Sequence, residues 1–229
     1  MTPEAKRAFK NTLYESFARV GKALSNGHRI ELLELLSQAE KTVEELSKEC
    51  DLSVANASQH LQTLKGAGVV ETRREGTFIF YRLAGPSAFK IWQSLRDFGE
   101  AQISDIQKLL KDVKENNGLT EGVDLTALQK KLKNGEVTLL DVRPESEYAS
   151  GHIQGAVSIP LEKLSKKMVS LPKNQEIVAY CRGPYCVFAD QAVTQLQRKG
   201  YRAARLSLGV PDWLAAGFAV SKSYPEQKK

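Results

Sequence analysis

Two cysteines lie close together after a predicted buried strand, and their type and position predict sulfur chemistry. Cys181 follows the largely apolar run 175–180, and Cys186 comes five positions later, directly before a helical pattern over 187–199. A loop that leads from a strand into a helix presents backbone N–H groups to an anion, and a helix N-terminus lowers the pKa of a thiol. We therefore expect Cys181 to act as a nucleophilic thiolate.

A thiolate at the entrance of such a loop can attack a sulfane sulfur and keep it as a persulfide. We expect backbone N–H groups of the loop to hold the persulfide anion, although Pro184 contributes none because it has no N–H. Arg182 adds a fixed positive charge for an anionic donor. The predicted sulfur site consists of Cys181, Arg182, Gly183, Tyr185, Cys186 and Val187.

Two interpretations of Cys186 remain open. It either packs in the first turn of the helix or resolves a persulfide on Cys181 into a disulfide or polysulfide bridge. The short loop brings the two sulfurs near each other without ensuring disulfide geometry.

A phosphatase of similar fold would need an arginine six positions after its cysteine, but position 187 is valine. This argues against a phosphatase and against arsenate reduction by the same type of loop.

The second half of the chain alternates predicted strands and helices, which is typical of an α/β domain with a parallel sheet. The run 137–143 is an apolar strand that ends in charge, and we expect Asp141 and Arg143 to pair with each other or with neighbouring backbone. In such sheets ligands bind beyond the carboxyl ends of the strands, where Cys181 falls. Asp141 and Arg143 are therefore predicted to support the site.

The blocks 141–160, 180–183 and 200–220 resemble the signatures of the rhodanese domain, over roughly residues 123–222. By this resemblance Cys181 is the catalytic cysteine, which accepts a sulfane sulfur as a persulfide and passes it to a thiol acceptor. The resemblance implies a small sulfur-containing anion or a persulfide as the donor. The further basic residue that thiosulfate-using members carry deeper in the loop is absent, so the donor stays open.

The first half of the chain has mainly helical patterns. Residues 42–45 predict a capping box that opens a short helix, and Ser53 is placed to cap the next helix over 54–65. The runs 69–73 and 77–83 predict a β-hairpin, so the order is that of a winged helix-turn-helix. After Pro86 we expect one long amphipathic helix to about residue 113.

The second helix of this motif has an apolar and a polar face. We expect Val54, Ala57, Leu61 and Leu64 to face the core. The polar side chains on the other face can reach base edges in a major groove, while the arginines of the wing can contact phosphates. Glu71 and Glu75 dilute that charge, which predicts a modest salt dependence. The predicted DNA-contacting residues are Ser53, Asn56, Ser58, Gln59, His60, Thr63, Arg73, Arg74 and Thr77.

The segments 42–46, 51–70 and 73–83 resemble the ArsR/SmtB family of dimeric bacterial repressors, over roughly residues 10–112. The resemblance implies a winged helix, a homodimer formed by the first and last helices of the domain, and a palindromic operator in double-stranded DNA. Two metal sites of the family are missing, because 42–49 has no cysteine and 87–111 has no histidine or cysteine. We predict no metal and no cofactor, and we expect Cys50 to be a small buried residue at a helix end.

Length, charge, apolar runs and cysteine count limit the class of protein. The 229 residues suffice for two domains, and the net charge of +6 does not itself indicate DNA binding, since charges nearly balance before residue 116. There is no 18-residue apolar run and no apolar segment of signal-peptide type at the N-terminus, which predicts a cytoplasmic protein without membrane contact. Three cysteines do not make a secreted disulfide framework.

The sequence therefore predicts two domains, a mainly α winged helix-turn-helix over 1–115 and an α/β rhodanese-like domain with a parallel sheet over 123–229, joined by a linker over 116–122. The favoured function is a transcriptional regulator, a repressor, that binds operator DNA and senses or transfers sulfane sulfur through a persulfide on Cys181. The alternative is a sulfurtransferase that uses thiosulfate or polysulfide and whose winged helix serves dimerisation or autoregulation. Whether the protein is an enzyme is left open.

Overall fold

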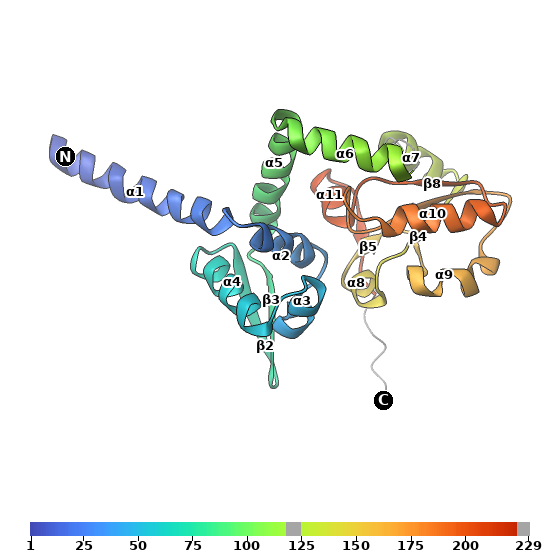
Figure 1. Cartoon of the computed structure of the whole chain (residues 1–229), viewed down its shortest axis with the longest axis horizontal. Coiled ribbons are helices and arrows are strands. Elements are labelled where there is room, and N and C mark those ends of the chain that lie inside the picture. The colour runs from blue at the N-terminus through green and yellow to red at the C-terminus, as the bar shows by residue number, and fades with distance from the viewer. Residues whose placement is uncertain (118–124, 224–229) are drawn as a thin grey trace. The chain divides into compact units, whose positions relative to one another are not determined.

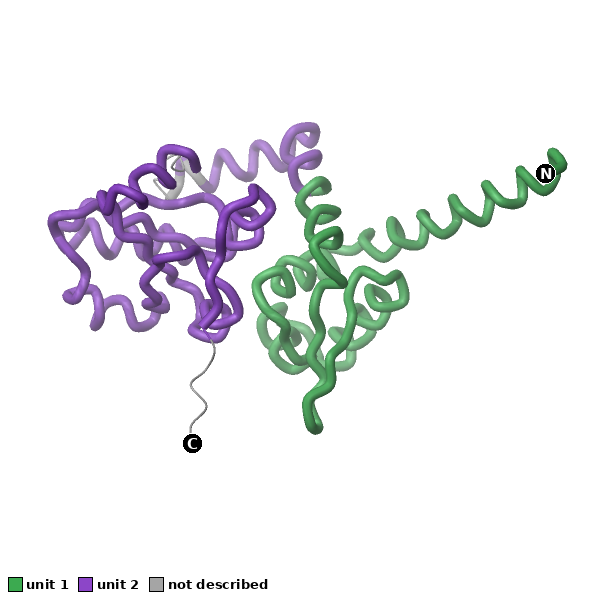
Figure 2. The backbone as a smooth tube through the Cα atoms, turned by 180° about the vertical axis from the view of Figure 1, so that it is seen from behind, with its two compact units in different colours: residues 1–95 green, residues 96–229 purple. Residues whose placement is uncertain are grey.

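The computed structural model describes residues 1–117 and 125–223 of the chain. Two compact units are formed, Met1–Leu95 and Arg96–Lys229, and Figure 2 colours them separately. The boundary falls inside helix α5 (Pro86–Gln102), so the domain limits 1–115 and 123–229 stay a prediction. Residues 118–122 of the predicted linker lie outside the described residues, and residues 116 and 117 end a helix.

Unit 1 has the predicted winged helix-turn-helix (Figure 1). Helices α3 and α4 form the helix-turn-helix, strands β2 and β3 form the wing, and the antiparallel sheet has the order β1-β3-β2. Helix α1 projects from the body of this unit in both views. The elements are α1 (Pro3–Leu24), α2 (Gly27–Gln38), β1 (Lys41–Thr42), α3 (Val43–Glu49), α4 (Val54–Gly66), β2 (Val70–Glu75) and β3 (Phe78–Leu83).

Side-chain caps fix where the two helices of the motif begin. The Thr42 hydroxyl accepts a hydrogen bond from the Glu45 amide at 3.3 Å, and the Thr42 amide donates to the Glu45 carboxylate at 2.8 Å. This reciprocal pair is the predicted capping box. The Ser53 hydroxyl accepts from the Asn56 amide at 3.2 Å, as predicted for the start of α4. Each cap satisfies backbone donors that lack a partner within the helix.

The core of unit 1 contains most of the apolar residues expected on α4. Ala57, Leu61 and Leu64 are fully buried, and Cys50 is a buried residue at the end of α3, as predicted. The prediction for Val54 was wrong, because it is 48% exposed. It is the first residue of α4, directly after the Ser53 cap.

The single long helix expected after Pro86 is instead two helices, α5 and α6 (Ser104–Asn117). The Ile103 carbonyl accepts from the amides of Ile106 and Gln107, both at 3.1 Å, and so starts a new helical turn. Gly99 explains the break, since a Cβ atom added there would lie only 3.3 Å from the Ile106 side chain. The glycine lets Ile106 fold back onto α5, and the helix changes direction at this point in Figure 1.

Unit 2 contains the predicted α/β domain. Its four-stranded sheet has the order β6-β4-β7-β8, and all neighbouring strands are parallel. A separate antiparallel pair joins β5 to β9. The remaining elements are α7 (Leu125–Lys133), β4 (Val137–Asp141), α8 (Glu145–Ser150), β5 (His152–Ile153), β6 (Val157–Ser158), α9 (Leu161–Lys167), the 3₁₀ helix η1 (Met168–Ser170), β7 (Glu176–Tyr180), α10 (Phe188–Arg198), β8 (Ala203–Arg205), α11 (Val210–Ala215) and β9 (Val220–Ser221).

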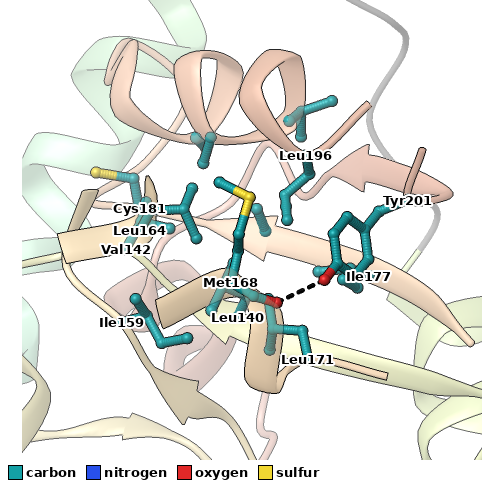
Figure 3. Packing of buried hydrophobic residues seen from close by; sticks show 14 residues of the cluster. Leu140, Val142, Ile159, Leu164, Met168, Leu171, Ile177, Cys181, Leu196 and Tyr201 are labelled. Carbon is teal, nitrogen blue, oxygen red and sulfur yellow. Dashed lines mark hydrogen bonds between the residues drawn. The ribbon is translucent and has the colours of Figure 1, made fainter. Parts of the chain in front are cut away.

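Both faces of this sheet are covered, so its strands are apolar on both sides. Leu140 and Ile177 belong to one buried cluster, while their neighbours Leu139 and Val178 belong to the other. Figure 3 shows the first cluster, which includes Cys181. Among the described residues, no helix is long and apolar enough to span a bilayer.

Candidate functional site

The Cys181 loop lies where the sequence predicts it, between the end of β7 and the start of α10. Tyr180 is the last residue of β7, and Val187 caps the helix that begins at Phe188. Because the sheet is parallel, the loop lies at the carboxyl edge, where α/β domains bind ligands. Cys181 is only 1% exposed and packs in the first core cluster.

Cys181 and Cys186 are joined by a disulfide, with their Cα atoms 6.3 Å apart. Cys186 also packs against the core cluster, as one of its two interpretations expects, while its role in resolving a persulfide stays a prediction. Its amide donates to the Gly183 carbonyl at 3.3 Å and closes a turn. The loop N–H groups were expected to hold the persulfide anion, but in the bridged loop this one donates to the Gly183 carbonyl instead. Gly183 has a φ of +156°, a value that favours glycine.

The positive charge of Arg182 is paired with a carboxylate. Its Nε lies 3.0 and 3.1 Å from the two oxygens of Glu147. The Glu147 side chain is fully buried, and that of Arg182 is 18% exposed. The sequence assigned Arg182 to an anionic donor, but a buried carboxylate needs a partner, and this guanidinium supplies it. Glu147 was not among the predicted site residues.

Arg205 at the end of β8 holds the middle of the loop. Its Nη2 donates to the Pro184 carbonyl at 2.6 Å and to the Gly183 carbonyl at 3.4 Å, while Nη1 binds the Asp190 carboxylate at 2.9 and 3.0 Å. Burial raises the pKa of the Asp190 carboxyl, and the nearby Arg205 charge partly opposes this. Sequence reasoning missed Arg205, although a charge in the apolar stretch 203–206 was a signal for it.

The start of α11 closes the loop from another side. A Cβ atom on Gly209 would overlap the carbonyl group of Arg182, so only glycine fits at this approach. The Gly209 amide donates to Asp212 Oδ2 at 3.2 Å. The other oxygen, Oδ1, accepts from Arg96 Nη2 of α5 at 2.9 Å. These contacts fix the backbone next to Cys181.

Tyr185, a predicted site residue, is tied to α5. Its hydroxyl donates to Glu100 Oε1 at 2.6 Å, and the side chain as a whole is 37% exposed. Both Glu100 and Arg96 were absent from the predicted site. They precede the break at Ile103 and are brought to the loop only by the fold of unit 2.

The predicted pair of Asp141 and Arg143 is present and fully buried. Arg143 Nη2 donates to Asp141 Oδ2 at 2.7 Å and to the Gly151 carbonyl at 2.7 Å. Burial opposes the charge of Arg143, but the hydrogen bonds and charge of Asp141 outweigh it, so the pKa of Arg143 is raised. The pair braces the end of β4, beside the strand that leads to Cys181.

A second candidate site is the exposed side of α4. Ser53, Asn56, Gln59 and Thr63 are exposed, as base-reading side chains require, whereas Ser58 and His60 are half-buried. The Ser53 hydroxyl is already used as a helix cap, and Thr63 Oγ1 donates to the Gln59 carbonyl at 3.0 Å.

His60 lies beside His28, with 5.7 Å between the ring centroids. Partial burial lowers the pKa of His60, and the positive charges of Arg29 and His28 lower it further. His60 therefore resists protonation more than an exposed histidine does.

The wing ends in a two-residue turn at Gly76 and Thr77, where Gly76 has a φ of +59°. The Arg73 guanidinium binds Glu40 through Nε at 3.0 and 3.1 Å and binds Glu75 through Nη1 at 2.6 Å. Arg74 is exposed and donates to the Gly76 carbonyl at 3.1 Å.

Glu71, which was expected to dilute the charge of the wing, instead pairs with Arg82 at 2.8 Å. The carboxylate that accepts from Arg73 Nε belongs to Glu40. Arg74 is therefore better placed than Arg73 to offer a positive charge to a phosphate.

Two family models match the chain, one in each half. Residues 26–72 match the model described as bacterial regulatory protein, arsR family, and residues 124–216 match the rhodanese-like domain. The first match contains the helix-turn-helix, and the second contains the Cys181 loop.

The chain is similar to proteins with related names. It is 38% identical over 216 residues to the HTH-type transcriptional regulator Rv0324 of Mycobacterium tuberculosis, covering 94% of this chain and 95% of that protein. It is 31% identical over 100 residues to a sulfurtransferase of Allochromatium vinosum, covering 43% of this chain and 92% of that protein. A homodimeric winged helix-turn-helix DNA-binding domain from Mycobacterium bovis is 38% identical, with a TM-score of 0.40 and coverage of 42% of this chain and 89% of that one.

Proposed function

Since the chain belongs to the ArsR family of bacterial regulatory proteins and carries a rhodanese-like domain, we propose that it is an operator-binding repressor controlled by sulfane sulfur at Cys181. The observation that carries this proposal is the disulfide between Cys181 and Cys186 in the loop of the rhodanese-like domain. A cysteine with a second thiol within bonding distance has two stable states, the reduced dithiol and the disulfide. A regulator requires two such states.

The DNA-binding part of the proposal rests on the exposed polar side of α4 and on Arg74 at the wing. These groups match the direct readout and phosphate contact of winged helix-turn-helix proteins. A homodimer is supported by α1, where Phe9, Tyr14 and Phe17 are each more than half exposed. Large apolar side chains of one helix are seldom left in water without a partner. A second copy would cover them and place two copies of α4 on a palindromic operator.

The sulfur chemistry proposed for the loop consists of two successive displacements at sulfur. In the reduced protein the Cys181 thiolate attacks the outer sulfur of a persulfide R–S–SH, the S–S bond of the donor breaks and the thiol R–SH leaves. The Cys186 thiolate then attacks Cys181 Sγ, and hydrogen sulfide leaves with the electron pair of the broken bond. The two thiols are oxidised to the disulfide, and the sulfane sulfur is reduced to sulfide.

A second function of a different class has its own support. The similarity to a sulfurtransferase favours an enzyme that hands the Cys181 persulfide to a thiol acceptor, with the winged helix serving dimerisation or autoregulation. In that scheme Cys186 packs the helix and resolves nothing. The two functions differ in whether sulfur at Cys181 changes the affinity for DNA.

The test measures sulfur chemistry and DNA binding on the same samples. An operator is first selected from a randomised duplex library with the reduced full-length protein. Wild type, Cys181→Ser and Cys186→Ser are then exposed to inorganic polysulfide, analysed by intact mass and titrated with the selected duplex. We expect wild type to form the bridge and change its affinity about tenfold, within the usual range of allosteric coupling.

The variants separate the two functions. Cys186→Ser is expected to retain a persulfide on Cys181, and Cys181→Ser to show no change in affinity. A wild-type persulfide without a linkage to Cys186 would overturn the resolving role. If polysulfide leaves the affinity unchanged while Cys181→Ser abolishes sulfur transfer to a thiol, the sulfurtransferase function replaces the regulatory one.

A further inference from the structure

The last two turns of α5 carry two side chains that bind the sulfur loop and its neighbour α11, all inside unit 2. Glu100 accepts the hydrogen bond of the Tyr185 hydroxyl at 2.6 Å, and Arg96 binds Asp212 at 2.9 Å. Arg96 and Glu100 are four residues apart, so they lie on the same face of the helix. One face of α5 therefore contacts two points of the site.

The contact between Arg96 and Asp212 is a buried anchor. The two side chains are 8% and 4% exposed. Separating such a pair would leave a charge buried without its partner, so the pair holds one geometry. Asp212 also binds the Gly209 amide, and Gly209 lies against the Arg182 carbonyl. This anchor lies outside the segment that the disulfide closes.

The contact between Tyr185 and Glu100 differs, because Tyr185 lies inside the closed segment. It directly precedes Cys186, and the amide of Cys186 closes the turn at Gly183. The bridge fixes both ends of this segment and with them the position of the Tyr185 ring. Arg205 holds the Gly183 and Pro184 carbonyls with or without the bridge. Without the bridge the Cys186 end of the segment has more conformations, and the hydrogen bond of the partly exposed Tyr185 hydroxyl to Glu100 is weakened.

Helix α5 continues from these residues back into unit 1 without interruption. Ala88 near its start belongs to the core of unit 1, and Phe89 and Trp92 are buried. Glu100 lies 12 positions after Ala88, a distance of about 18 Å along the helix. A change in how the end of α5 is held thus acts on an element whose start is part of the DNA-binding unit.

We propose that the hydrogen bond between Tyr185 and Glu100 is the contact through which the state of the sulfur loop acts on α5. This rests on the proposed function and specifies the contact that links the state of the sulfur loop to helix α5. In the bridged state Tyr185 is fixed and holds Glu100, while in the reduced state it releases Glu100 and α5 stays attached through Arg96 and Asp212. The side chains of Tyr185 and Glu100 are positioning groups for the signal, distinct from the backbone N–H groups that are expected to hold the persulfide.

The experiment uses the full-length protein and the selected operator duplex. Wild type, Tyr185→Phe, Glu100→Gln and the double variant are each fully reduced or fully bridged with diamide, and intact mass verifies the state. The measured quantity is the ratio of DNA affinities in the two states. We expect this ratio to fall about fivefold in each single variant, the lower end of allosteric coupling, and no further in the double variant.

The control variant is Asp105→Asn, which makes the same change from carboxylate to amide at an exposed position of α6. It is expected to keep the wild-type ratio. A structural role of Tyr185 and Glu100 alone would lower thermal stability and leave the ratio unchanged.

The two proposals fail in different ways. If wild type itself has the same affinity in both states, the proposed function is overturned. If wild type responds and Glu100→Gln responds equally, only the contact is excluded as the route of the signal. Single variants whose effects add up in the double variant would also overturn the inference, because they would act independently.

Discussion

The guanidinium of Arg182, the residue next to Cys181, is held by the fully buried carboxylate of Glu147, with Nε 3.0 and 3.1 Å from its two oxygens. The loop therefore carries an arginine whose charge is balanced within the protein. Arg205 is balanced in the same way by Asp190. Both ion pairs anchor the loop at the edge of the sheet.

Glu147→Gln is expected to destabilise unit 2 by about 3 kcal/mol, because breaking a buried ion pair leaves a charge without its partner. Urea unfolding followed by the fluorescence of Trp213, in a Trp92→Phe background, measures the effect. The matched control is Glu145→Gln on the same helix, since Glu145 pairs with Lys163 at the surface. That change should have a much smaller effect, and equal losses in the two variants would contradict the role given to Glu147.

Gly209→Ala is expected to displace the loop, because the new Cβ atom would overlap the Arg182 carbonyl group. Overpacking of this kind costs about 1–3 kcal/mol, and the moved backbone should slow persulfide formation at Cys181. The rate is measured by intact mass after polysulfide is added to the reduced protein. Gly151→Ala is the control, since its Cβ atom meets open space. A wild-type rate in Gly209→Ala would show that this approach does not matter.

Arg74→Ala should weaken operator binding more than Arg73→Ala. Arg73 is bound by Glu40 and Glu75, and these carboxylates raise its pKa and balance its charge, whereas Arg74 is exposed. If Arg74 neutralises one phosphate, its loss lowers the slope of log K against log salt by about 0.9. Titrations at several salt concentrations test this, with Arg198→Ala in unit 2 as the control. The ranking is wrong if Arg73→Ala gives the larger change in slope.

His60 should titrate below an unperturbed histidine, because burial and the charges of Arg29 and His28 lower its pKa. The folded state then binds fewer protons than the unfolded state, so stability from this group falls as the pH drops through about 6.5. NMR titration of the ring proton measures the pKa directly. His28→Gln is expected to raise it, while Lys199→Gln in unit 2 leaves it unchanged. No rise in His28→Gln would remove His28 as a cause.

Much of the fold could be predicted because local patterns determine it. The capping box at Thr42 and Glu45, the cap at Ser53 and the hairpin around Gly76 each depend on a few neighbouring residues. The parallel sheet follows from apolar strands that alternate with helices. The break at Ile103 was missed because both sides share one amphipathic pattern, and only packing of Ile106 against Gly99 interrupts it.

The amino-acid sequence alone predicts a cysteine at the end of a buried strand, five positions before another cysteine, in a chain that also carries a winged helix-turn-helix. The side chains that surround this loop are known only from the folded chain. Glu147, Arg205 and Glu100 are 34, 24 and 81 positions from Cys181 in the sequence, and no local pattern links them to it. Their pairing depends on which side chains meet when the sheet and helices pack, because a buried charge binds whatever partner the fold places within reach.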